Sequence, residues 1–275
     1  MPNPMPTITL NNGVQLPQLG YGVFQVPDDE TTAAVSAALG AGYRSIDTAA
    51  VYGNERGTGR AIAESGIARD ELFVTTKLWN SEQGDPTPAA FDASLEKLGL
   101  DYVDLYLIHW PSPARDLYLK TWEAFEKLYA DGRVRAIGVS NFLPEHLQRI
   151  IDLGGTVPAV NQIELHPALQ QRTITEFAGA HGIAIEAWSP LAQGAVLSEP
   201  AITTIAARVG RTAAQVVLRW HLQQGRIVIP KSVTPSRIAE NFDVLDFTLT
   251  DADLAGIDAL ERDGRTGPHP AEFNR

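Results

Sequence analysis

The chain has 275 residues, of which 44% are hydrophobic, and a formal net charge of −11. This composition suits a globular protein with a sizeable core, and the acidic charge argues against nucleic acid or an anionic membrane as a partner, because both bind basic surfaces. The absence of cysteine excludes disulfides and thiolate metal sites.

The N-terminal segment lacks the basic stretch and apolar core of a secretory signal. Two short apolar runs, ITL and VQL, flank the pair Asn12-Gly13, which suits a tight turn with positive φ. We therefore expect the chain to open with a β-hairpin that forms a small lid outside the main fold.

From residue 19 onwards, short apolar runs typical of buried strands alternate with amphipathic segments typical of helices. Eight such strand–helix units, with no linker between halves, favour one α/β domain over residues 1–275, a (β/α)8 TIM barrel with an N-terminal β-hairpin and a short C-terminal tail over its rim. The expected strands are LGYGVF (19–24), RSIDTA, LFVTTKL, DYVDLYLIHW, AIGVSNF, AVNQIEL, AIEAWSP and RIVIPKS. The expected helices are 28–41, 54–65, 87–98, 117–131, 144–153, 171–181, segments within 199–223, 235–244 and one after Thr250.

An open doubly wound sheet is the competing architecture, and it would carry GxGxxG between its first strand and first helix. The nearest pattern, Gly57-Thr58-Gly59, lacks the third glycine and begins inside an expected helix. We interpret these glycines as lying on a helix surface, and the dinucleotide fingerprint is therefore absent.

Several expected strands stop at an ionisable side chain. Asp47 and Tyr52 stand at the end of the second apolar run. Lys77 and His109 end the third and the fourth. Because a barrel of parallel strands carries its chemistry at the carboxyl ends of the strands, we expect these side chains to meet at one mouth.

These four residue types suit proton transfer. A phenol with an unperturbed pKa of about 10 is a weak acid near neutral pH. An ammonium beside it, from Lys77, should lower the pKa of Tyr52, while Asp47 balances the buried charge. A neutral His109 can donate an N–H to a carbonyl oxygen and orient it. Taken singly, each residue also fits an ordinary structural role, and only their joint occurrence favours catalysis.

Five motifs occur in order along the chain: GYRSIDTAAVYGNE (42–55), TTKLW (75–79), LIHWP (107–111), GVSNF (138–142) and IPKS (229–232). Together they resemble the aldo-keto reductases, NADPH-dependent carbonyl reductases on a (β/α)8 barrel, and within them the bacterial 2,5-diketo-D-gluconic acid reductase branch. The resemblance implies that Tyr52 is the general acid in reduction, that Asp47 and Lys77 tune it, and that His109 orients the substrate.

The segment after the last expected strand suits a phosphate group. Lys231 and Arg237 supply two cations near a helix N-terminus, although a solvated basic turn is the alternative interpretation. The resemblance assigns the 2′-phosphate of NADPH/NADP+ to this segment, the carboxamide to the ends of the GVSNF and VNQIE runs, the nicotinamide face to Trp188 and the pyrophosphate to SPLAQG. The implied coenzyme residues are Ser140, Asn141, Gln162, Trp188, Ser189, Leu191, Gln193, Gly194, Ile229, Lys231, Ser232, Val233, Thr234, Arg237, Glu240 and Asn241.

Phe24, Val51, Trp79 and Trp110 are expected to form apolar substrate walls, with ordinary core packing as the alternative. The short stretch after His109 and the short tail indicate a shallow, permissive pocket. Aldehydes, dicarbonyls, keto sugars and keto acids all remain candidate substrates.

The resemblance therefore predicts NADPH-dependent reduction of aldehydes and ketones by hydride transfer. An NADPH-binding redox sensor with slow carbonyl reductase activity is the alternative, and a barrel isomerase or aldolase is a third option. We expect a cytoplasmic monomer with no membrane partner. No pair of histidines shows the spacing of metal ligands, so no metal site is expected.

Overall fold

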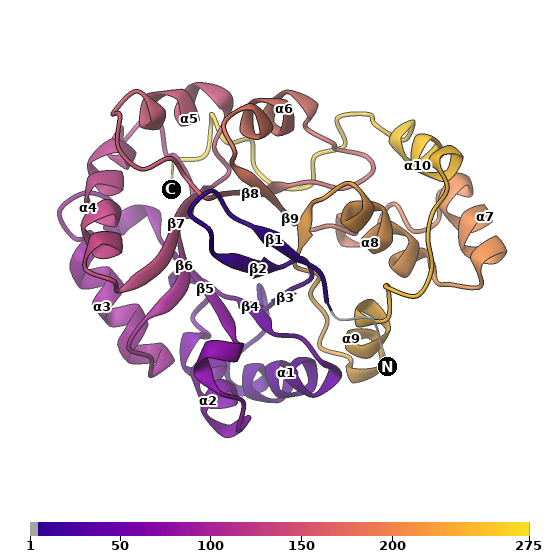
Figure 1. Cartoon of the computed structure of the whole chain (residues 1–275), viewed down its shortest axis with the longest axis horizontal. Coiled ribbons are helices and arrows are strands. Elements are labelled where there is room, and N and C mark those ends of the chain that lie inside the picture. The colour runs from indigo at the N-terminus through magenta and orange to yellow at the C-terminus, as the bar shows by residue number, and fades with distance from the viewer. Residues whose placement is uncertain (1–4, 275) are drawn as a thin grey trace.

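The computed structural model describes residues 5–274, and residues 1–4 of the segment considered for a secretory signal lie outside that range. Eight parallel strands follow one another in chain order around a curled sheet (Figure 1). They are β3 (Tyr21–Gly22), β4 (Ser45–Asp47), β5 (Phe73–Leu78), β6 (Val103–Ile108), β7 (Val134–Ser140), β8 (Val160–Glu164), β9 (Ala184–Trp188) and β10 (Ile227–Val228).

The sheet closes on itself between its first and last strands. Leu19, just before β3, forms a parallel bridge with Val228 of β10, and the N–H of Gly20 donates to the carbonyl of Val228 at 2.8 Å. A Cβ on Gly20 would lie 2.9 Å from Oγ of Ser45, so the glycine permits this close approach. Closure confirms the predicted (β/α)8 barrel.

Helices follow the strands and cover the outside of the ring (Figure 1). None of the helices in the described part of the chain combines the length and apolar character needed to traverse a bilayer. The helices are α1 (Asp28–Ala41), α2 (Glu55–Glu64), α3 (Thr87–Leu98), α4 (Tyr118–Ala130), α5 (Pro144–Ile151), α6 (Arg172–Ala180), α7 (Pro200–Val209), α8 (Ala213–Gln223), α9 (Pro235–Phe242) and α10 (Asp251–Asp258).

The predicted hairpin is confirmed as β1 (Thr7–Thr9) paired antiparallel with β2 (Gln15–Pro17). Its apolar residues Leu10 and Leu16 pack against Phe73 and Ile227, the first residues of β5 and β10. The hairpin therefore covers the amino ends of the strands, opposite the end where β5 and β6 reach Lys77 and His109. At its turn only Gly13 has a positive φ, of 86°, so Asn12 does not share the conformation expected for the pair.

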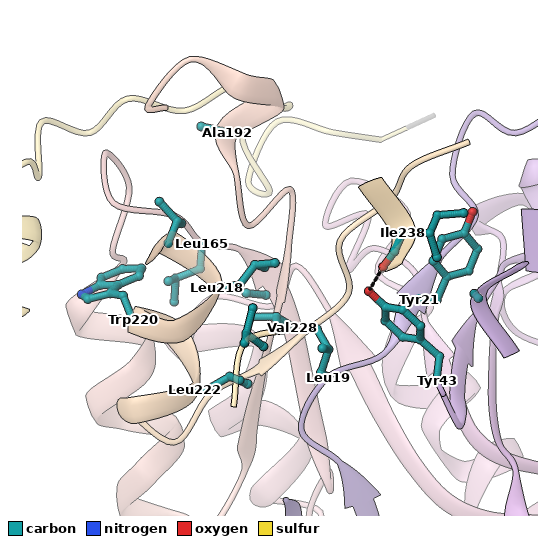
Figure 2. Packing of buried hydrophobic residues seen from close by; sticks show 14 of the residues in the cluster. Leu19, Tyr21, Tyr43, Leu165, Ala192, Leu218, Trp220, Leu222, Val228 and Ile238 are labelled. Carbon is teal, nitrogen blue, oxygen red and sulfur yellow. Dashed lines mark hydrogen bonds between the residues drawn. The ribbon is translucent and has the colours of Figure 1, made fainter. Parts of the chain in front are cut away.

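The core between barrel and helices also holds the segment after β10. Figure 2 shows Tyr21 and Tyr43 beside Ile238 of α9. The phenol of Tyr43 donates to the carbonyl of Ile238 at 3.3 Å, and the phenol of Tyr21 donates to the carbonyl of Ser232. Two buried tyrosines thus fix the backbone around residues 232–238, where the sequence predicts a phosphate site.

The two glycines interpreted as lying on a helix surface are buried, so that interpretation is wrong. Gly57 and Gly59 lie where α2 packs between its neighbours α1 and α3. A Cβ on Gly57 would lie 2.6 Å from the carbonyl oxygen of Asp28, and one on Gly59 would lie 2.2 Å from the carbonyl oxygen of Leu98. Both positions need glycine because backbone, which cannot move aside cheaply, fills the adjacent space.

This packing predicts opposite outcomes for two glycine substitutions. Gly59→Ala should destabilise the protein by about 1 to 3 kcal/mol, since the added methyl overlaps the end of α3. Gly40→Ala, in α1 with nothing within 4 Å of its Cβ, should instead stabilise it by about 0.5 to 1 kcal/mol. Urea unfolding midpoints measure both, and equal midpoints for the two variants would contradict the packing argument.

Candidate active site

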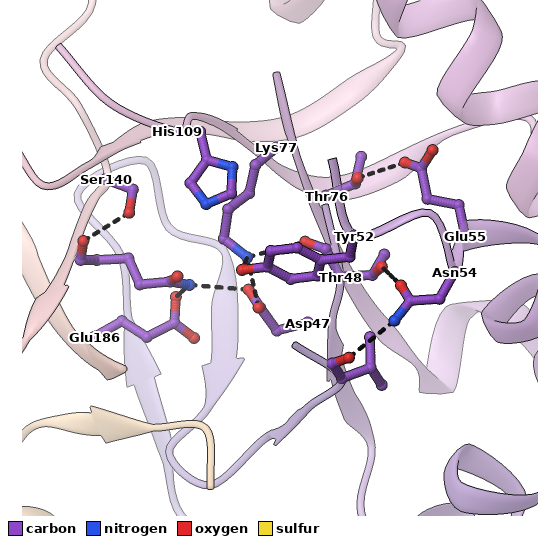
Figure 3. A network of polar contacts seen from close by, with 12 residues as sticks. Asp47, Thr48, Tyr52, Asn54, Glu55, Thr76, Lys77, His109, Ser140 and Glu186 are labelled. Atoms are coloured by element: carbon purple, nitrogen blue, oxygen red, sulfur yellow. Dashed lines mark hydrogen bonds and ion pairs between the residues drawn. The ribbon is translucent and has the colours of Figure 1, made fainter. Parts of the chain in front are cut away.

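Three of the side chains predicted to share one mouth are in direct contact (Figure 3). The buried ammonium of Lys77 lies 2.5 Å from Oδ1 of Asp47, the last residue of β4. The same Nζ donates to the carbonyl of Thr48 at 2.9 Å and lies 3.4 Å from the phenol oxygen of Tyr52. These contacts fix the direction of the ammonium and point it at the phenol.

His109 lies near the phenol of Tyr52, beside Lys77 (Figure 3). Its ring centroid is 5.6 Å from that of Tyr52 and 5.2 Å from that of Trp79, and both pairs are edge-on. Burial, with a further contribution from Lys77, lowers the pKa of His109 well below its ordinary value. The imidazole is therefore neutral near pH 7 and has one N–H to donate.

Burial decides the pKa of the phenol. It raises the pKa of Tyr52, and the lowering by Lys77 that the sequence predicts is present but does not reverse the net shift. Burial alone lowers the pKa of Lys77, but the adjacent Asp47 carboxylate raises it, so the ammonium stays charged. The expectation of a lowered phenol pKa is thus wrong in its net direction, and Tyr52 keeps its proton at neutral pH.

Gln162 extends this cluster across the barrel to a residue that the sequence analysis did not single out. Its Nε2 donates to Oδ2 of Asp47 at 2.9 Å and to Oε2 of Glu186 at 2.8 Å. Glu186 is fully buried in β9. The signal that could have identified it is an acidic residue in the middle of an apolar run, AIEAW, expected to be a buried strand.

Residues at the carboxyl ends of β7 and β9 form a second network. Trp188 Nε1 donates to Oδ1 of Asn141 at 2.8 Å, and Nδ2 of Asn141 donates to the carbonyl of His109 at 3.0 Å. Ser140 donates through its hydroxyl to the carbonyl of Gln162 at 2.8 Å. These contacts hold the indole of Trp188 in place. The side-chain oxygen Oε1 of Gln162, which takes part in none of them, has no donor among the described residues.

A cavity of about 1170 Å³ brings most of the predicted residues together. Three of the four predicted catalytic residues line it, while Lys77 lies buried beneath them. Val233 and Thr234 are the two predicted coenzyme residues that do not line it. The predicted residues that do are Phe24, Asp47, Val51, Tyr52, Trp79, His109, Trp110, Ser140, Asn141, Gln162, Trp188, Ser189, Leu191, Gln193, Gly194, Ile229, Lys231, Ser232, Arg237, Glu240 and Asn241.

The far end of the cavity fits a phosphate. Lys231 and Arg237 line it, and within residues 5–274 neither forms an ion pair or a hydrogen bond through its side chain. The N-cap of α9, Thr234, makes no side-chain capping bond, so the helix N-terminus keeps free N–H groups. Unpartnered cations and free N–H groups at one end, with the Gln162 acceptor at the other, match the NADPH that the motifs imply.

The substrate end is more enclosed than the short tail suggests. Phe273 packs on Trp110 with ring centroids 4.4 Å apart and lies 6.1 Å from Trp79. The four predicted wall residues line the cavity, and Phe24 is 55% exposed, which excludes it from the core. Phe273 lies in a polar, proline-containing tail, and no local pattern singled it out.

Glu164 fastens this tail to the barrel. Its buried carboxylate accepts hydrogen bonds from the N–H and hydroxyl of Thr266, both at 2.6 Å, and from the N–H of Gly267 at 3.0 Å. Nε2 of His166 lies 3.1 Å from Oε1 of the same carboxylate. Burial alone would raise the pKa of Glu164, but hydrogen bonds from His166, Thr266 and Gly267 lower it to about 2.

Comparison with known proteins gives matches along almost the whole chain. The model of the aldo/keto reductase family matches residues 16–262. The chain is 52% identical over 269 residues to a glyoxal reductase of Bacillus subtilis (strain 168), covering 97% of each chain. It is 51% identical over 275 residues to the methylglyoxal reductase DkgA of Escherichia coli (strain K12), covering 99% of each.

The solved structures show the same relationship. A crystal structure of a Gox0644 mutant in complex with NADPH superposes with a TM-score of 0.94, at 50% sequence identity and with 98% of each chain covered.

The tail anchor predicts an acid-dependent loss of stability. Glu164→Gln should destabilise the protein by on the order of 2 kcal/mol. The substitution replaces one acceptor oxygen by an NH2 group, which would face the N–H and O–H donors of the tail and leave some of them without an acceptor. Since folding lowers the pKa of Glu164 to about 2, the carboxylate stabilises the fold above its unfolded pKa of about 4.5 and loses this contribution as the pH falls towards 2.

Melting temperatures of wild type and Glu164→Gln, measured from neutral pH down to about pH 3, check this. Their difference should stay constant above about pH 5 and shrink below it. A difference that is independent of pH would show that the charge of Glu164 does not hold the tail.

Proposed function

Because this chain belongs to the aldo/keto reductase family and is an NADPH-dependent carbonyl reductase, we propose that Tyr52 is its proton donor and that small uncharged dicarbonyl compounds are its substrates. The observation that carries the proposal is the contact of the phenol with a buried, charged Lys77 beside a neutral His109. A phenol that is protonated at neutral pH, next to an ammonium, is arranged to give up its proton when negative charge develops on a carbonyl oxygen.

Each of the four residues has one part in the proposed reaction. His109 donates an N–H to the carbonyl oxygen and orients it toward the phenol. Tyr52 protonates that oxygen as the carbonyl carbon is reduced. Lys77 stabilises the phenolate that this transfer leaves, and Asp47 keeps the ammonium charged and directed.

The coenzyme, when bound, supplies the hydride that adds to the carbonyl carbon. The residues of this chain would hold it along the cavity. We propose that Gln162 accepts from the carboxamide, that Trp188 covers the nicotinamide face and that Lys231 with Arg237 binds the 2′-phosphate. Glu240 and Asn241 would meet the adenine, with the Thr212 hydroxyl donating to Glu240 at 2.9 Å and fixing that side chain.

The substrate class is proposed from the relatives and from the charges of the cavity. The glyoxal and methylglyoxal reductases, by their names, act on the smallest dicarbonyls. In this chain Trp79, Trp110 and Phe273 surround the mouth, and the two exposed cations of the cavity lie at its far, phosphate end. A substrate carboxylate beside Tyr52 would therefore find no counter-ion among the described lining residues, which disfavours keto acids.

The redox-sensor alternative is not favoured, because the catalytic cluster is intact and the similar proteins are named as reductases. We further propose that the eight units act as one domain over residues 1–275, as a monomer in the cytoplasm, where NADPH is available. Gel filtration of the pure protein tests the proposed monomer directly.

Removing the phenol hydroxyl tests the proton donor. Tyr52→Phe should lower kcat for carbonyl reduction by about a hundredfold to ten-thousandfold, the usual contribution of a positioned acid. NADPH affinity, measured by quenching of tryptophan fluorescence, should stay within about twofold of wild type, because no coenzyme contact is lost. Near-wild-type turnover in this variant would exclude Tyr52 as the donor.

Two ketones of nearly equal size test the substrate class. Butane-2,3-dione has an acetyl group where pyruvate has a carboxylate, so the pair tests the effect of a negative charge beside the ketone. We expect kcat/KM with NADPH to be at least about a hundredfold higher for the dione, because an unpaired carboxylate is costly to bury. Comparable values for both ketones would contradict the preference for uncharged dicarbonyls while leaving the reaction itself intact.

A further inference from the structure

Glu186 is a buried carboxyl that the proposed mechanism does not use. It lies within β9, pairs in register with Gln162 of β8 and is fully shielded from solvent. Its Oε2 accepts the hydrogen bond from Gln162, and its Oε1 is buried without a partner among the described residues. Burying such a group destabilises a fold unless something compensates for it, which points to a role in the function of the site.

Gln162 connects Glu186 to the catalytic cluster. One N–H of its amide is given to Glu186 and the other to Asp47. Turning the amide over would place its oxygen against the carboxylate of Asp47, which is paired with Lys77 and can only accept, so the orientation is fixed. The oxygen Oε1 is consequently left for the cavity, where it can accept a hydrogen bond from an amide N–H.

We propose that Glu186 is a positioning residue for the reaction: it fixes the amide of Gln162, and its charge acts on both the phenol of Tyr52 and the nicotinamide that Gln162 would hold. This inference rests on the proposed function, and it adds a group that couples the site to pH.

The surroundings of Glu186 make its charge sensitive to pH near neutrality. The ionisable groups that face it are Asp47 from β4, Lys77 from β5 and Tyr52, while β10 presents the apolar Ile227 at the same register. Burial first, and then Asp47, raise the pKa of Glu186 to about 8, and the hydrogen bond from Gln162 together with Lys77 offsets only part of this. The carboxyl is therefore neutral at pH 7 and ionises just above it.

Ionisation changes the balance of charge in the cluster from one carboxylate and one ammonium to two carboxylates and one ammonium. The added charge raises the pKa of Tyr52, so the phenol keeps its proton more firmly. It also favours the oxidised coenzyme, because the nicotinamide ring of NADP+ is a cation and that of NADPH is neutral. Binding of NADP+ should therefore release a proton from Glu186 near pH 8.

Coenzyme affinity gives the first test. The ratio of the dissociation constant of NADPH to that of NADP+ is measured at about pH 6.5 and about pH 9 for wild type and Glu186→Gln. The ratio should rise about fivefold with pH in wild type and stay constant in Glu186→Gln, whose amide cannot ionise. The 2′-phosphate is common to both coenzymes, so its own titration cancels in the ratio.

A second substitution separates position from charge. Glu186→Leu removes the acceptor for Gln162, whereas Glu186→Gln keeps one in its amide oxygen. At about pH 6.5, Glu186→Leu should bind both coenzymes at least about fivefold more weakly than wild type, and Glu186→Gln should bind them as wild type does. In alcohol oxidation, which needs the phenolate, Glu186→Gln should reach its alkaline plateau at a lower pH than wild type.

Stability of the protein without coenzyme provides a readout independent of activity. Folding raises the pKa of Glu186, so its contribution to stability is fully present below the unfolded pKa of about 4.5 and is lost as the pH rises through about 8. The melting temperature of Glu186→Gln should therefore increase relative to wild type across this window.

Glu55→Gln is the matched control for the affinity measurement. The buried carboxyl of Glu55 accepts from Thr76 and does not contact Gln162, so the ratio of the coenzyme dissociation constants in Glu55→Gln should change with pH as it does in wild type.

The inference would be overturned if the ratio of the NADPH and NADP+ dissociation constants changed with pH in Glu186→Gln as much as in wild type. It would also be overturned if this ratio did not change with pH in wild type. If Glu186→Gln does not fold, calorimetry of wild type in two buffers of different ionisation enthalpy still decides the matter. Near pH 8, NADP+ binding should release more protons than NADPH binding, and equal release would overturn the inference. Failure of the proposed function would look different, because wild type itself would then neither bind NADPH nor reduce carbonyls.

Discussion

The buried ion pair between Lys77 and Asp47 is the constraint on which the rest of the site depends. Two charges removed from water must be paired closely and have their remaining hydrogen bonds satisfied, since breaking such a pair costs about 3 to 5 kcal/mol. Adjacent strands β4 and β5 bring the two side chains together, and Thr48, Gln162 and Tyr52 complete their contacts. The same requirements that stabilise the pair therefore also place the phenol and the amide that the reaction uses.

The cavity around this pair is built from less regular parts of the chain. Four non-glycine residues that line it have positive φ angles between 46° and 63°, namely Gln25, Asn141, Ser189 and Gln193. Such conformations are strained and persist only where surrounding contacts impose them. Here the side chain of Asn141 makes three hydrogen bonds, with His109, Ser140 and Trp188, and its backbone N–H donates to the carbonyl of Gln162. The rigid strands thus support a shaped rim, and the tail completes it through its contacts with Glu164.

Much of this could be predicted from the sequence because the relevant signals are local. Alternation of strand-like and helix-like patterns located the barrel units to within a few residues, and α1 and α3 match their expected ranges, 28–41 and 87–98. Asp47, Lys77 and His109 stand at the ends of buried runs, and in a parallel barrel the ends of strands share one edge. The proximity of these three residues follows from their positions in the repeat. The enclosure of the pocket by Phe273 does not, because the path of an irregular tail depends on distant anchors.

What the amino-acid sequence by itself determined is the succession of elements, the barrel and the residue types available at its mouth, because periodicity and strand ends are properties of neighbouring residues. Only the tertiary structure decided which groups touch across the ring. It brought Glu186 of β9 and Asp47 of β4 to the same side-chain amide, that of Gln162, and it buried Gly59 against α3. It also made burial outweigh Lys77 in setting the pKa of Tyr52. These outcomes depend on distances and solvent exclusion between segments far apart in the chain, which no local pattern encodes.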